Sequence, residues 1–123
     1  MRQETSGQVG YRKLIVWQKS HQLAKDIYKV TNDFLKSELF GLTSQMRRCA
    51  VSVPANLVGG YSRKTIKDKL NFFVIARSSL TELEYYLDLS FELNYIKEES
   101  YHKLTATRSE VGRLLNGFIN SFQ

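Results

Sequence analysis

The chain has 123 residues, 42% of them hydrophobic and 24% charged, and carries a formal net charge of +6. This size and composition are typical of a single globular domain, and no apolar run of about 18 residues could cross a bilayer. The polar start lacks the apolar core of a secretory signal, and the single cysteine excludes an internal disulfide framework. A cytoplasmic protein is therefore expected.

Apolar residues recur at helical spacing along the chain, and no alternating pattern typical of strands is present. Four helices are predicted, over residues 13–35, 42–58 and 66–93, and from residue 97 toward the C-terminus. Short loops join them, so neighbouring helices must run antiparallel. We predict an all-α, up-down-up-down four-helix bundle as one domain over residues 11–123, preceded by a mobile tail over residues 1–10.

A few residues should set the ends of these helices. We expect Thr43 or Ser44 to cap the second helix and Thr65 to cap the third, because hydroxyl oxygens accept from free amides at helix starts. The pair Gly59 and Gly60 should end the second helix. The third should break at Asn94 and Tyr95.

The second helix, within LTSQMRRCAVSVPANLVGG, contains the only proline of the chain. Pro54 lacks a backbone donor and clashes with the carbonyl of Ala50, so the helix should kink there or restart. Asn56 is expected to satisfy backbone groups that Pro54 leaves free. Cys49 lies on the apolar seam, which predicts a small buried hydrophobe and no nucleophile.

Charge is divided along the sequence. Residues 41–77 hold seven basic side chains against the single acid Asp68, whereas residues 78–100 hold six acids against Lys97. Antiparallel helices should bring these blocks toward opposite ends of the bundle. The simpler alternative, two solvated faces without a partner, fits the same pattern.

The residues offer little for catalysis. Glu99 and His102 have the Glu-x-x-His spacing of di-iron bundles, but His21 has no matching acid, so no metal site is predicted. No arginine stands four to six residues before either histidine, as small helical ribonucleases require, and no glycine-rich phosphate motif is present. We predict no enzyme, no cofactor and no metal.

Binding fits the residues better. The cations expected to neutralise phosphates, and the ring expected to stack on an unpaired base, are Arg47, Arg48, Arg63, Lys64, Lys67, Lys69 and Tyr61. Arg77 is expected to be structural, in an ion pair with an acid such as Glu82 or Glu84 of a neighbouring subunit. No base-reading module is present, so sequence-specific recognition is not predicted.

Several motifs carry a resemblance over residues 11–122. They are LIVW at Leu14–Trp17, EL-x-GLTSQ at Glu38–Gln45, two basic residues followed by Ser-x-Pro-x-Asn at Arg47–Asn56, and IARSSLTELE at Ile75–Glu84. With them the chain resembles the four-helix-bundle proteins encoded in intervening sequences of bacterial large-subunit ribosomal RNA genes. It departs from that family at Gly59, where an acid is usual, and at Ser78, where glycine is common.

The resemblance implies a ring-shaped homopentamer, and distant relatives accompany the reverse transcriptase and template RNA of diversity-generating retroelements. Complementary charged zones would suit such a head-to-tail ring. The leading hypothesis is a non-enzymatic, RNA-binding oligomeric scaffold. The alternatives are an adaptor that associates with a reverse transcriptase, and, third, an enzyme.

Overall fold

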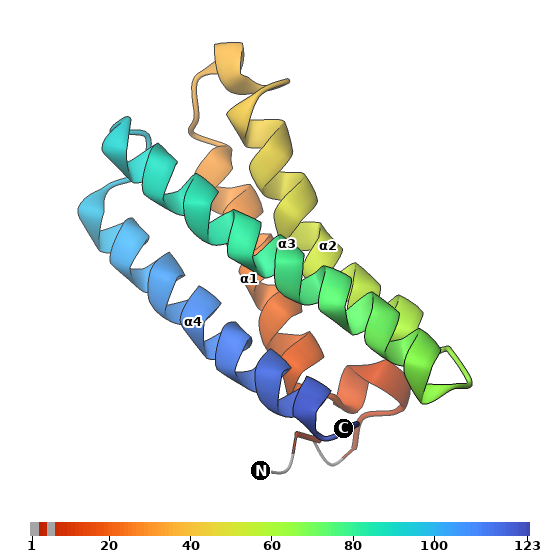
Figure 1. Ribbon diagram of the computed structural model, residues 1–123. Helices are drawn as coiled ribbons and strands as arrows, with labels where there is room; N and C mark the ends of the chain where they lie inside the picture. The colour runs from red at the N-terminus through yellow and green to blue at the C-terminus, as the bar shows by residue number, and fades with distance from the viewer. Residues whose placement is uncertain (1–2, 5–6) are drawn as a thin grey trace.

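The computed structural model describes residues 3–4 and 7–123. Its elements in chain order are η1 (Gly10–Lys13), α1 (Ile15–Thr31), η2 (Lys36–Glu38), α2 (Leu42–Tyr61), α3 (Ile66–Glu92) and α4 (Glu98–Asn120). Figure 1 shows consecutive helices running antiparallel, and α1 packs against both α2 and α4, which closes the bundle. The predicted all-α four-helix bundle is confirmed. In the described part of the chain, no helix has the length and apolarity to span a bilayer.

The core lies between the four helices, because each has one apolar stripe that faces inward. Its largest fully buried side chains come from every helix and include Ile27, Met46, Phe73, Leu83 and Leu115. Cys49 is buried in this core, as the sequence predicted. Tyr28 of α1, by contrast, is 46% exposed.

Helix α2 does not stop at its glycine pair, which corrects the sequence prediction. It continues to Tyr61, and Gly59 and Gly60 lie within its last turn against α3. A Cβ atom at Gly60 would lie 2.5 Å from Cε1 of Phe73, and one at Gly59 would lie 2.9 Å from ring carbons of Phe72. The glycines therefore serve close helix packing, and a side chain at either position would push the helices apart.

The start of α2 also differs from the prediction, because neither Thr43 nor Ser44 caps it. The Glu38 carboxylate does so from η2, with Oε1 accepting from the amide of Leu42 at 3.2 Å. Its Oε2 accepts from the hydroxyl of Tyr95 at 2.9 Å, which connects the two loops at this end. A Cβ atom at Gly41 would lie 2.9 Å from that carboxylate, so the glycine leaves room for the cap.

Both ends of α3 follow the sequence prediction. Thr65 Oγ1 accepts from the amide of Asp68 at 3.1 Å and caps the start. At the other end Asn94 has φ of 64°, and the amide of Tyr95 donates to the carbonyl of Ser90 at 2.8 Å. These features form a Schellman motif, which ends the helix.

Helix α1 is shorter than the predicted span of 13–35. Leu14 is extended, with φ of −75° and ψ of 122°, and separates η1 from α1. At the far end the hydroxyl of Thr31 donates to the carbonyl of Ile27 at 2.7 Å, and the chain then turns into η2. Leu35, expected in the last turn, is 60% exposed.

Pro54 lies inside α2 without interrupting it, so the predicted restart of the helix does not occur. The predicted kink stays a prediction. Asn56 differs from its expected role: its side-chain amide donates to the carbonyl of Ser52 at 2.7 Å, not to the carbonyl of Ala50 that Pro54 deprives of a donor. Its side chain reaches back one turn, whereas Ala50 lies six residues earlier.

The predicted tail at residues 1–10 falls partly on residues 1–2 and 5–6, which lie outside the described residues. Gln3 and Glu4 contact the bundle. The Gln3 amide donates to the carbonyl of Leu114 at 2.7 Å, and Glu4 forms an isolated antiparallel bridge with Leu14. Gly10 already begins η1.

Candidate nucleic-acid interface

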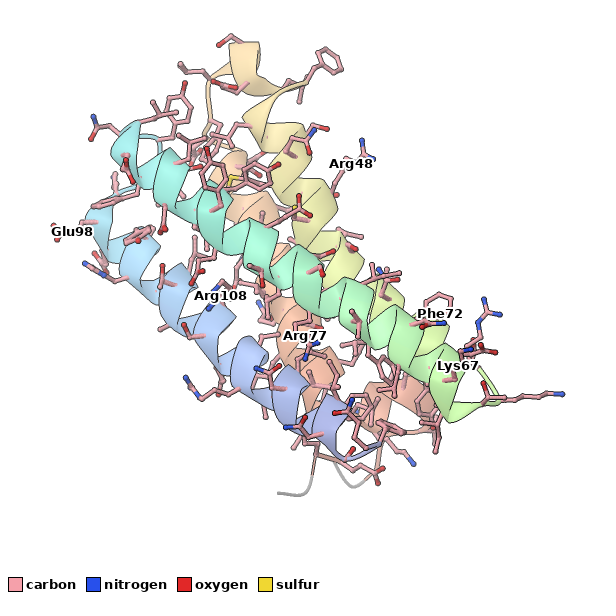
Figure 2. All side chains as sticks on the ribbon, viewed as in Figure 1. Arg48, Lys67, Phe72, Arg77, Glu98 and Arg108 are labelled. Carbon is pink, nitrogen blue, oxygen red and sulfur yellow. The ribbon has the colours of Figure 1, made fainter. Side chains whose placement is uncertain are left out.

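The turn between α2 and α3 carries the densest group of basic side chains. Arg63 and Lys64 lie in the turn itself, and Lys67 and Lys69 lie in the first turn of α3. The side chains of Arg63, Lys64 and Lys67 are exposed, and no ion pair holds any of them within residues 3–4 and 7–123. Figure 2 shows Lys67 beside the turn. We call Arg63, Lys64 and Lys67 the basic turn.

Lys69 belongs to the same block of sequence but has a structural role. Its ammonium group donates to the carbonyl of Tyr61 at 2.9 Å and lies near that of Gly60 at 3.5 Å. These carbonyls end α2, and cations are stabilising at helix C-termini. Lys69 is therefore already engaged by the fold and is less available to a phosphate than its neighbours.

Tyr61, expected to stack on a base, is half-buried and packs against the core. The ammonium group of Lys69 lies 5.6 Å from its ring centroid. Phe72, the other ring beside the turn, has the guanidinium of Arg63 4.7 Å above it. Cations cover the aromatic faces at this end, so phosphate contact is the chemistry that the basic turn offers most directly.

The arginine pair of α2 is divided between two sides of the helix. Arg47 points to α1, where its Nε donates to the hydroxyl of Thr31 at 2.9 Å and its guanidinium lies 4.7 Å over the ring of Tyr28. Arg48 is exposed on the other side (Figure 2) and lines a hollow with Cys49 and Glu82. The fold therefore separates two residues that the sequence analysis treated as one pair.

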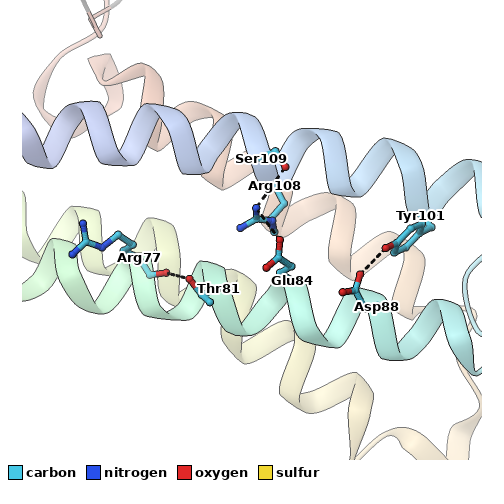
Figure 3. Close-up of polar contacts among 7 residues, drawn as sticks. All are labelled: Arg77, Thr81, Glu84, Asp88, Tyr101, Arg108 and Ser109. Atoms are coloured by element: carbon cyan, nitrogen blue, oxygen red, sulfur yellow. Dashed lines mark hydrogen bonds and ion pairs between the residues drawn. The ribbon is translucent and has the colours of Figure 1, made fainter.

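Arg77 is exposed, and its Nη1 lies 3.4 Å from the side-chain oxygen of Asn116 on α4. Glu84, one of its two expected acidic partners, pairs with Arg108 of the same chain at 3.3 Å. Figure 3 shows the Glu84–Arg108 ion pair in a seam between α3 and α4 that also holds the hydrogen bond from the Tyr101 hydroxyl to Asp88. An ion pair of Arg77 with another subunit stays a prediction.

The acidic block lies toward the opposite end of the bundle from the basic turn. Figure 2 places Glu98, at the start of α4, far from Lys67. Asp88, Glu92 and Glu99 lie near the same α3–α4 connection in the sequence. The predicted separation of charge along α3 is therefore present, with the basic turn at the start of the helix and acids toward its end.

The two histidines and the cysteine, which are the side chains considered for catalysis or metal binding, are engaged in other contacts or buried. His102 pairs with Glu98 at 3.5 Å, not with Glu99, the acid of the Glu-x-x-His spacing. His21 stacks on Trp17, with ring centroids 4.7 Å apart and planes inclined by 10°. Burial, together with the nearby Glu82 carboxylate, raises the pKa of the Cys49 thiol to about 11, although Arg48 lowers it slightly. The thiolate that a nucleophile needs is therefore scarce near neutral pH.

One surface was missed by the sequence reasoning. Along α1, His21, Lys25 and Tyr28 follow one another at helical spacing and line a groove against α2, and Trp17, one turn earlier, stacks on His21. Arg12 of η1 stands near its start, with its guanidinium 4.8 Å over the ring of Tyr11. The spacing was visible in the sequence, but rings at such positions are usually assigned to the core.

Fold and composition thus define a basic, all-α four-helix-bundle protein. Residues 12–117 match the model of a family described as 23S rRNA-intervening sequence protein, and the chain belongs to that family. No curated protein matches the chain.

A crystal structure of a protein of unknown function from the S23 ribosomal protein family of Bacteroides thetaiotaomicron VPI-5482 is similar to this chain. The TM-score is 0.80 and the identity is 26%, over 86% of this chain and 96% of the other. The two proteins therefore share the whole bundle.

Proposed function

We propose that this protein is a non-enzymatic RNA-binding scaffold that contacts phosphates through the basic turn. The observation that carries the proposal is the exposure of Arg63, Lys64 and Lys67 without acidic partners in the described chain, at the tip of the α2–α3 hairpin. Cations so placed attract a polyanion and release its counterions on contact. The family's description links its members to 23S ribosomal RNA, which makes RNA the first polyanion to test.

Binding is preferred to catalysis because the reactive side chains lie apart and are engaged. The imidazole of His21 stacks on Trp17, that of His102 pairs with Glu98, and the Cys49 thiol is buried and protonated. General acid–base chemistry needs such groups together within reach of one substrate. Binding of a cytoplasmic RNA, by contrast, requires only an exposed basic surface.

A second part of the proposal is assembly into a homo-oligomer. At the end of the bundle opposite the basic turn, the η2 loop exposes apolar side chains, with Leu35 60%, Leu39 49% and Phe40 93% accessible. Apolar groups clustered at one surface favour a protein contact. A ring such as a pentamer would cover this loop, and in the alternative adaptor function a reverse transcriptase would cover it.

Light scattering separates these two possibilities. An oligomer of the isolated chain should have a mass several times 14.3 kDa, and Phe40→Ser should lower it. A monomer that assembles only when a reverse transcriptase is added would favour the adaptor.

The RNA proposal is tested by neutralising the basic turn. The triple variant Arg63→Gln, Lys64→Gln, Lys67→Gln should weaken binding to unrelated structured RNAs and reduce the log-log salt slope by about 2, since each lost phosphate contact removes about 0.7 to 0.9. Lys69 is left unchanged because it caps α2.

The matched control removes the same charge elsewhere. Lys29, Lys97 and Lys103 are also exposed and lie toward the other end of the bundle, so their triple Gln variant should keep most of the affinity. Anisotropy of labelled RNA measures both variants. An equal loss of RNA affinity in the two triple variants would mean that only the net charge matters. Wild-type affinity in the basic-turn variant would reject the basic turn as the RNA site.

A further inference from the structure

The groove between α1 and α2 has the chemistry of a nucleotide site. It is a hollow of about 350 Å³ lined by His21, Ala24, Lys25, Tyr28, Val51 and Pro54. This volume falls within the range of small-molecule sites, about 300 to 1,000 Å³. Its walls are mostly apolar, with one ring from His21 near one end and one from Tyr28 near the other.

The charge of this groove distinguishes it from two other hollows of similar size. The hollow between α1 and α4 is lined by Asp26 and Asp33, and the hollow between α2 and α3 by Glu82. The α1–α2 groove has no acidic side chain in its lining, and Lys25 is exposed and makes no ion pair with the described residues. An anionic ligand with a flat apolar part fits this combination.

Two aromatic rings, His21 and Tyr28, flank one cation, Lys25, in the lining of the groove. Trp17 and His21 stack on each other at 4.7 Å, Tyr28 carries the Arg47 guanidinium over its ring, and Lys25 lies between them in the helical ladder. Such interleaving is how proteins hold single-stranded nucleic acid, with rings stacking on bases and cations following the backbone.

We propose that the α1–α2 groove takes an unpaired base of the RNA whose phosphates the basic turn holds. The inference rests on the proposed function and assigns it a substrate class, RNA with single-stranded segments. It adds the groove formed by His21, Lys25 and Tyr28 as a place for base stacking beside Tyr61. The η1 segment, which contacts α2 and carries Arg12, lies near the start of α1 and extends the basic surface toward the groove.

The test compares a short oligoadenylate with a duplex RNA of the same length. The double variant His21→Leu, Lys25→Gln should bind the oligoadenylate about tenfold more weakly, the size expected from one stacked base, and should bind the duplex as wild type does. Both side chains are exposed, so the bundle should remain folded, which thermal melting checks. The matched control is His102→Leu, Lys103→Gln on α4, which should leave both affinities unchanged.

Trp17 is the only tryptophan and gives an independent signal. Oligoadenylate should quench its emission, whereas the duplex should not. Unchanged binding of oligoadenylate by the double variant, or equal quenching by the two RNAs, would overturn the inference while leaving the basic turn as an RNA site. If Trp17 emission varies with protein concentration and is insensitive to RNA, the groove binds a second copy of the chain and the inference is wrong. If the wild-type protein binds no RNA at all, the proposed RNA-binding function is itself rejected.

Discussion

Along one side of α3, small residues let α2 approach closely, whereas along the other side long polar side chains bridge to α4. In the first hairpin, ring carbons of Phe72 and Phe73 lie against Gly59 and Gly60, and the hydroxyls of Ser79 and Ser52 meet at 2.8 Å. In the second, the helices are connected by the Glu84–Arg108 and Asp88–Tyr101 contacts of Figure 3.

This difference shows which part of the bundle is built to be rigid. The rings packed against the glycines leave no room for an added atom, while partly exposed polar contacts such as Glu84–Arg108 are worth about 1 kcal/mol each. The basic turn stands at the tip of the tightly packed hairpin, so its cations are presented on a fixed base. The α3–α4 seam should be the softer of the two.

The largest expected effect comes from adding one methyl group to the tight hairpin. In Gly60→Ala the new Cβ would lie 2.5 Å from Phe73, which is held by Phe118 and Phe122 at ring distances of 5.0 Å and 5.5 Å. Overpacking costs about 1 to 3 kcal/mol and outweighs a gain of about 1 kcal/mol in helix propensity. We expect a net loss of about 1 to 2 kcal/mol in urea unfolding.

The same substitution in α4 is the control. In Gly112→Ala the new Cβ would lie at an ordinary 3.7 Å from Leu80, so the variant should be up to about 1 kcal/mol more stable than wild type. Equal effects of the two substitutions would remove the contrast between the hairpins.

The polar seam should respond unequally to the loss of its two charged partners. The Arg108 side chain is 15% exposed and its Nε has no partner in the described chain, whereas Glu84 is 52% exposed. Glu84→Ala leaves a mostly buried guanidinium and should cost about 1 kcal/mol, while Arg108→Met leaves only a solvated carboxylate and should be nearly neutral. Urea unfolding of both variants checks that Glu84→Ala loses more stability than Arg108→Met. A larger loss in Arg108→Met would contradict this prediction.

The N-termini of α3 and α4 differ in capping, and this difference should have a smaller effect on stability. Thr65→Ala removes the cap of α3 and should cost about 0.5 to 1 kcal/mol. Lys97 occupies the corresponding position of α4 with extended backbone, φ of −67° and ψ of 150°, and no side-chain bond, so Lys97→Ser should stabilise by about 0.5 kcal/mol. The melting temperature should therefore fall in Thr65→Ala and rise in Lys97→Ser. Shifts in the same direction would contradict the conclusion that α3 has a side-chain cap and α4 has none.

The smallest effect concerns alkaline pH. The hydrogen bond to Asp88, with burial, raises the pKa of the Tyr101 phenol above its ordinary value near 10. Above about pH 10 the unfolded chain loses this proton before the folded chain does. The contribution of the Tyr101–Asp88 hydrogen bond to folding stability is therefore fully present below that pH and is lost as pH rises through the folded pKa. Tyr101→Phe should flatten the alkaline fall in stability, measured by unfolding at neutral and alkaline pH; an unchanged fall would assign it to other groups.

The sequence predicted what depends on local patterns. Helical spacing identified the four helices, Thr65 had the residue type and position of a cap, and Asn94 tolerates the left-handed backbone that ends α3. Local rules failed where a distant residue decided the outcome. Gly59 and Gly60 have the composition of a helix stop, but Phe72 and Phe73 of α3 determine why they are small.

The candidate site was predicted in the same uneven way. Exposure of Arg63, Lys64 and Lys67 followed from their position in a basic turn. The engagement of Lys69 with the end of α2, the covered ring of Tyr61 and the opposed directions of Arg47 and Arg48 could not be predicted, because each depends on how two helices face each other. Glu38 was missed as a cap since it reaches α2 from a loop segment.

Hydrogen exchange of the wild-type protein with and without structured RNA tests the central claim most directly. Bound RNA should slow exchange of backbone amides in residues 62–69 around the basic turn and leave those of residues 93–97, at the opposite end, unchanged. Protection confined to residues 93–97, or bound RNA without protection near the basic turn, would contradict the account.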